Sequence, residues 1–74
     1  MEAHLGPEEI NRLQNYLRRK VNPDFRLVTR KQTDDSVEVY LAEEFVAVIY
    51  KDVDEGEISY QFQMTILVED LGGD

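Results

Sequence analysis

The stretch EISYQFQMTIL, residues 57–67, carries the clearest pattern in the chain. Large apolar residues alternate there with polar ones. Because successive side chains of a β-strand point to opposite faces of a sheet, this alternation predicts a strand with one buried face and one solvated face. The apolar face consists of Ile58, Tyr60, Phe62, Met64 and Ile66.

Three further strands are predicted upstream of this stretch. FRLVTR (residues 25–30) alternates weakly, and SVEVYL (residues 36–41) places Val37, Val39 and Leu41 on one face. FVAVIY (residues 45–50) is apolar on both faces, which is typical of a strand covered on both sides. The connections KQTDD and AEE are short, so we expect strands that are neighbours in sequence to pair antiparallel.

One helix is predicted before the strands, in GPEEINRLQNYLRRKV (residues 6–21). Gly6 suits the N-cap and Pro7 the first helical position, while Asn22-Pro23 ends the helix because the residue before a proline disfavours the α conformation. The apolar stripe of this helix is formed by Ile10, Leu13, Leu17 and Val21.

The expected fold is therefore α+β: one N-terminal helix packed on a four-stranded antiparallel meander sheet, in the order α-β-β-β-β. We expect residues 1–74 to form a single domain, with a mobile leader at 1–6 and a mobile tail at 70–74. The helix should cover the sheet face that carries Val37, Val39, Leu41, Tyr60, Phe62 and Met64.

The acidic segment KDVDEGEIS (residues 51–59) has part of a calcium-loop pattern. Asp52 and Asp54 have the spacing of the first two ligands. However, Gly56 stands where the third ligand is needed, and Phe62 stands where the chelating glutamate is needed. We therefore predict a hairpin loop of four to six residues with Gly56 at positive φ, and no metal site.

The composition offers little for catalysis or for a bound cofactor. The chain has no cysteine and no glycine-rich phosphate loop, and its one histidine, His4, lies in the expected leader. A chain of 74 residues also has little volume for a small-molecule pocket. We expect no enzyme activity, no cofactor and no small-molecule substrate. Because no apolar run approaches a membrane span and no signal peptide is evident, we expect a cytoplasmic protein.

The charge is distributed unevenly along the chain, whose net charge is −8. Residues 12–31 contain seven basic residues and one acidic residue, whereas residues 32–74 contain one basic and twelve acidic residues. Such asymmetry indicates an interaction surface or simply a well-solvated helix and strand. If the basic residues track phosphates, the candidate nucleic-acid surface is Arg18, Arg19, Lys20, Arg26 and Arg30.

One helix can cover only one face of a four-stranded sheet, so the opposite face is a candidate contact surface. Depending on register, the third strand presents there either Val46, Val48 and Tyr50 or Phe45, Ala47 and Ile49. We take the first set, and the alternative is that a tail or an edge strand covers this face. The candidate partner or dimer surface is Val28, Tyr40, Val46, Val48 and Tyr50.

Several segments resemble a family of short alphaproteobacterial proteins, the domain of unknown function 3126. These segments are PEEINRLQNYLRR, DSVEVYLAEEFVAVIYKDVDEGEISYQFQMTIL and EDL, and the likeness runs from Pro7 to about Leu71. The resemblance implies a bacterial cytoplasmic origin. It implies no catalytic residues.

These features together predict a small protein-interaction module without catalytic activity. Small domains without disulfides or metals often gain stability by oligomerisation, so we expect a homodimer formed through the outer sheet face or an edge strand. The partner would be a second copy, an unidentified protein, or both, with no membrane involved. The alternative is an RNA-binding accessory protein that uses the basic residues named above.

Overall fold

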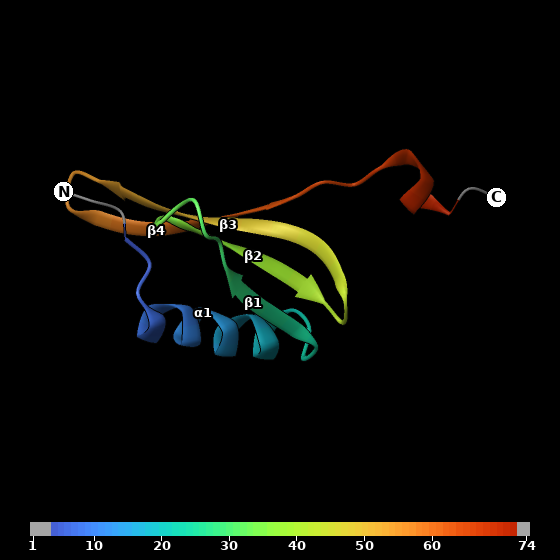
Figure 1. Ribbon diagram of the computed structural model, residues 1–74, viewed down its shortest axis with the longest axis horizontal. Coiled ribbons are helices and arrows are strands. Elements are labelled where there is room, and N and C mark those ends of the chain that lie inside the picture. Colours follow the sequence, from blue (N-terminus) through green and yellow to red (C-terminus); the bar gives the residue numbers. More distant parts are fainter. Residues whose placement is uncertain (1–3, 73–74) are drawn as a thin grey trace.

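The computed structural model describes residues 4–72 and confirms the predicted fold (Figure 1). Four strands form one antiparallel sheet in the order β1-β2-β3-β4, and the helix packs on one of its faces. The elements are α1 (Pro7–Lys20), β1 (Phe25–Thr29), β2 (Ser36–Leu41), β3 (Glu44–Asp54), β4 (Glu57–Met64) and the short 3₁₀ helix η1 (Val68–Leu71). Of the predicted mobile ends, residues 1–3 and 73–74 lie outside the described part of the chain.

Helix α1 begins and ends where its sequence indicates. Gly6 is the N-cap in an extended conformation, and Pro7 occupies the first helical turn with Glu8 and Glu9. The backbone N–H of Val21 donates to the carbonyl of Leu17, and Val21 is the C-cap. Val21 is 61% exposed, so its prediction as part of the buried stripe is wrong. The physical reason is that Val21 is the C-cap residue, whose φ of −120° departs from the helical value, so the helical repeat that defines the stripe ends before it.

The core lies between α1 and the facing side of β1, β2 and β3. The strand register places Leu27, Val39 and Ala47 in one row and Val37 beside Ile49 in the next, all on the helix side. The buried apolar residues of this core are Leu5, Leu17, Phe25, Val37, Val39, Ala47 and Ile49. Leu5 belongs to the segment predicted as a mobile leader. Its backbone N–H donates to the carbonyl of Asp34 at 2.7 Å, and its side chain is buried in the core.

The sheet turns through two short hairpins. Ala42 and Glu43 connect β2 to β3, and Glu55 and Gly56 connect β3 to β4. Both residues of the second connection have positive φ, +52° and +84°, as in the type I′ turn that matches the twist of paired strands. The loop predicted at four to six residues is thus a two-residue turn. Strand β3 extends to Asp54, because the alternating polar residues after Tyr50 continue the ladder.

A β-bulge re-orients the start of β3. The register between β2 and β3 shifts between Val39 and Tyr40, so Tyr40 pairs with Phe45 while Val39 pairs with Ala47. The extra residue, Val46, is partly buried and packs against the core. Val46 therefore does not join the outer-face cluster in which it was predicted, and Phe45 lies beside Tyr40 instead. A bulge changes the side on which a residue points, and strict alternation does not reveal it.

Helix α1 is seated on the β1 side of the sheet (Figure 1). Arg18 Nε donates to the carbonyl of Phe25 at 2.7 Å, and the backbone N–H of Leu27 donates to Gln14 Oε1 at 2.9 Å. A helix is about 10 Å across, whereas the outer strands of a four-stranded sheet lie about 14 Å apart. The inner side of β4 is consequently left half-covered. Tyr60, Phe62 and Met64 lie on the predicted face but are 37%, 40% and 51% exposed, so the expectation that the helix covers them is wrong.

The two hairpin turns provide a matched pair of substitutions. Ala42 has φ +58°, a left-handed conformation that costs a residue with a Cβ about 1 kcal/mol. We expect Ala42→Gly to raise the free energy of unfolding by about 0.5–1 kcal/mol, measured by urea denaturation. Gly56→Ala should lower it by a similar amount. The added Cβ at Gly56 meets no atom within 4 Å, so this cost is purely one of backbone conformation. A loss of stability in Ala42→Gly would contradict this account of the turn.

Candidate interaction surface

An open groove of about 1050 Å³ runs between α1 and β4, and we call it the α1–β4 groove. Leu13, Tyr16 and Leu17 contribute from α1, and Tyr60 and Phe62 contribute from β4. The ring of Phe62 stacks on the buried ring of Phe25, with centroids 6.1 Å apart, which anchors the groove to the core. The full lining is Glu9, Arg12, Leu13, Asn15, Tyr16, Leu17, Arg18, Arg19, Ile49, Tyr60 and Phe62.

One end of the groove is fixed by a polar cluster. Lys51 Nζ lies 2.9 Å from Glu9 Oε2 and also donates to the carbonyl of His4 at 2.8 Å. The Tyr60 hydroxyl donates to the same Glu9 carboxylate. These contacts join the first turn of α1 to β3 and β4. They are charge-assisted, and such hydrogen bonds are stronger than neutral ones.

The cluster shifts the pKa values of two of its members. Burial alone would raise the pKa of Glu9, but the hydrogen bonds from Tyr60 and Lys51 and the Lys51 charge together lower it below 4.5. Burial and the hydrogen bond to the Glu9 carboxylate raise the pKa of Tyr60 to about 12. The contribution of Glu9 to stability is thus present above pH 4.5 and is lost as the pH falls through its lowered pKa. The contribution of Tyr60 to stability is present below pH 10 and is lost as the pH rises toward 12.

The outer sheet face carries four of the five residues predicted as a partner surface, but it does not gather them into one apolar patch. Val28 and Val48 lie on either side of Glu38, and Tyr50 lies between Ser36 and Gln61. The Arg26 guanidinium lies 5.1 Å from the centroid of the Tyr40 ring, and the Phe45 ring meets Tyr40 edge-on at 5.9 Å. Tyr40 and Phe45 therefore already contact neighbouring side chains.

The basic residues predicted as a nucleic-acid surface are divided between two sides of the molecule. Arg18, Arg19 and Lys20 end α1, whereas Arg26 and Arg30 lie on the outer sheet face. Arg30 Nε lies 3.8 Å from Glu38 Oε2, and its terminal nitrogen donates to Ser36 Oγ at 3.2 Å. The structure does not bring the five residues together.

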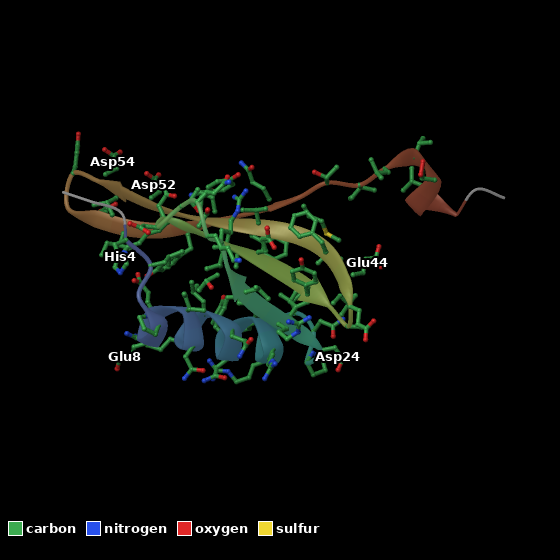
Figure 2. All side chains as sticks on the ribbon, viewed as in Figure 1. His4, Glu8, Asp24, Glu44, Asp52 and Asp54 are labelled. Atoms are coloured by element: carbon green, nitrogen blue, oxygen red, sulfur yellow. The ribbon has the colours of Figure 1, made fainter. Side chains whose placement is uncertain are left out.

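The acidic residues are spread along the fold (Figure 2). Asp52 and Asp54 lie near the β3–β4 turn, whereas Asp24 and Glu44 lie at the other end of the sheet. Within residues 4–72, no three His, Cys, Asp or Glu side chains are grouped so that they could hold a metal ion. No helix in this part of the chain has the length and apolarity needed to cross a membrane.

Sequence reasoning missed the α1–β4 groove, although a signal was present. The predicted sheet has four strands with apolar inner faces, and a single 14-residue helix is too narrow to cover them all. The sequence did not indicate which strand would be left half-covered. That depends on the contacts of Gln14 and Arg18 with the backbone of β1.

These features define a two-layer α+β protein with an exposed apolar groove beside an edge strand. The family model described as "Protein of unknown function (DUF3126)" matches residues 9–70, and the chain belongs to this family. No curated protein and no solved structure was found to match the chain.

The raised pKa of Tyr60 is directly measurable by the absorbance of tyrosinate during a pH titration. We expect one transition with a midpoint near pH 12 in the folded protein, absent from Tyr60→Phe. Glu9→Gln should lower that midpoint, because it removes the negative charge beside the hydroxyl. A Tyr60 transition that is unchanged in Glu9→Gln would show that the polar cluster does not control this tyrosine.

Proposed function

We propose that the protein is a non-catalytic protein-interaction module that associates with a second copy of itself through the α1–β4 groove. The observation that carries the proposal is that Tyr60, Phe62 and Met64 are left exposed in a line along β4, an edge strand next to that groove. Contiguous exposed apolar surface beside a strand edge is typical of protein–protein contact sites.

The two edges of the sheet differ in a way that supports this choice. The edge at β1 is occupied by α1, through the Gln14 and Arg18 side chains that bond its backbone. The edge at β4 has a strand neighbour on one side only. The two-residue turn at Glu55-Gly56 makes Asp54 and Glu57 a hydrogen-bonded pair, and such pairs alternate with non-hydrogen-bonded pairs along the ladder. The backbone N–H and C=O groups of every second residue after Ile58 therefore point away from β3, toward the open edge. Tyr60, Phe62 and Met64 thus present both apolar side chains and backbone polar groups at this edge.

The same geometry supports the proposal of a homodimer. A two-fold axis allows the same surface of both copies to meet, because such an interface has only to complement itself. Antiparallel strand edges satisfy this condition, and the aromatic residues of the groove supply the apolar area that an interface core needs.

The other candidate surfaces have weaker support. On the outer face, the Tyr40 ring contacts Phe45 and Arg26, and the apolar residues are separated by polar ones. RNA binding by Arg18, Arg19, Lys20, Arg26 and Arg30 would need residues from opposite sides of the sheet to contact one backbone. The proposal retains the bacterial, cytoplasmic setting that the family resemblance implies.

The test is the solution mass, measured by light scattering on a size-exclusion column, of the native protein and of two matched variants. We expect the native protein to have twice the chain mass of 8.7 kDa. Tyr16→Glu should give the single-chain mass, because it places a charge in the groove at a half-exposed helix position. Arg12 and Arg19 are one turn away on α1, so the new carboxylate should not unfold the helix.

The control is Tyr50→Glu, the same chemical change on the outer face, which should leave the dimer intact. A native protein that stays monomeric at millimolar concentration would refute self-association. Dissociation by Tyr50→Glu but not by Tyr16→Glu would move the interface to the outer face.

A further inference from the structure

The chain after β4 forms a projecting arm, residues 65–71, which ends in η1 and which we call the C-terminal arm. It leaves the end of β4 and runs away from the sheet and the helix (Figure 1). The molecule is 47 Å long but only 24 and 22 Å in its other dimensions. Its radius of gyration is 13.5 Å, whereas a compact domain of this length has about 11 Å. The arm thus projects from an otherwise compact body.

The C-terminal arm is apolar, yet it is exposed to solvent. Ile66 is 63% exposed, Val68 82% and Leu71 73%. Burial of such side chains is worth about 1.5–3 kcal/mol each, so an arm that keeps three of them in water forgoes substantial stabilisation. This composition is unlike that of a solvated tail, which is typically polar.

The arm fits the α1–β4 groove in length. Its three extended residues span about 10 Å and the four residues of η1 about 8 Å, so the arm is roughly 18 Å long. The groove runs along α1, whose 14 residues span about 21 Å.

The arm also fits the groove in charge. Arg12, Arg18 and Arg19 line the groove, and its one acidic residue, Glu9, is already paired with Lys51. The sequence from Thr65 to Asp74 contains acidic residues, Glu69 among them, and no Lys or Arg. The arm and the groove are therefore complementary in two ways: both carry apolar side chains, and the arm is acidic whereas the groove is basic.

The arm of one chain is poorly placed to enter the groove of the same chain. To do so, the chain would have to reverse direction immediately after Met64, where the sequence is Thr65-Ile66-Leu67. Thr and Ile are β-branched residues that favour extended backbone, and the segment has none of the Gly, Pro, Asn or Asp residues that form tight turns. An extended arm reaches outward, where a second molecule would lie.

We infer that the C-terminal arm of each copy lies in the α1–β4 groove of the other, so that the dimer is formed by reciprocal exchange of arms. This inference rests on the proposed function and names the segment that fills the groove. Exchange of an identical segment between two copies is a low-cost route to a closed two-fold dimer.

The first experiment compares two Ile→Ser variants of the full chain by sedimentation equilibrium. Ile66→Ser changes the arm, and Ile58→Ser makes the same change on β4 beyond the groove, at a similarly exposed side chain. If the arm is exchanged, Ile66→Ser should raise the dimer dissociation constant at least about tenfold, while Ile58→Ser should change it less than threefold. Equal effects of the two variants would overturn the inference.

The second experiment locates the arm without weakening the dimer. A photo-reactive benzoylphenylalanine in place of Val68 is irradiated, and the products are separated by mass under denaturing conditions. We expect a product of two chains, joined at a peptide from α1 or β4. A single-chain product joined to those peptides would show that the arm occupies its own groove. A two-chain product joined to the outer face would show a different exchange. Either result would overturn the inference.

The two proposals can fail separately. If Tyr16→Glu dissociates the dimer but Ile66→Ser does not, the groove is the interface and the arm is not its occupant. If Tyr16→Glu has no effect, the groove itself is excluded and the arm inference falls with it.

Discussion

The packing of α1 against the edge of β1 is the constraint on which the rest of the structure depends. The Arg18 and Gln14 side chains bond the backbone of β1, and Leu17 packs into the core beneath them. These contacts cover one edge of the sheet and draw the helix toward it. Because a single helix cannot span four strands, the opposite edge at β4 is left with apolar side chains in solvent. The α1–β4 groove is thus a direct consequence of how the helix is anchored.

The cluster of Glu9, Lys51 and Tyr60 keeps that groove open in a defined shape. It joins the start of α1 to the two strands farthest from β1, so the helix is held at both ends, by β1 at one and by β3 and β4 at the other. On the inner side of β4, the ring of Phe62 also stacks on that of Phe25 in β1, which joins this strand to the core. The polar cluster at one end of the α1–β4 groove and the Phe25–Phe62 contact therefore hold the apolar surface of the groove in place without covering it.

A domain of this size has little core, and this one places part of its apolar surface outside the core. Within residues 4–72, seven apolar side chains are buried, whereas Tyr60, Phe62 and Met64 on β4 and the apolar residues of the C-terminal arm form a second, exposed apolar surface. Small domains without disulfides or metals often complete their stability by association. Groove and arm are complementary in length and charge, and this complementarity is the basis for proposing a second copy as the partner.

The sequence by itself determined the helix α1, the four strands, their order and the antiparallel meander, because periodicity and capping are local properties of the chain. It also placed Tyr60, Phe62 and Met64 on the helix side, since alternation fixes the face of a side chain. Only the tertiary structure decided whether those residues are covered, because that depends on where α1 sits across the sheet. The tertiary structure likewise decided the bulge that turns Val46 inward and the hydrogen bond that anchors Leu5 beside Asp34. Both depend on contacts between segments distant in sequence, and no local pattern encodes them.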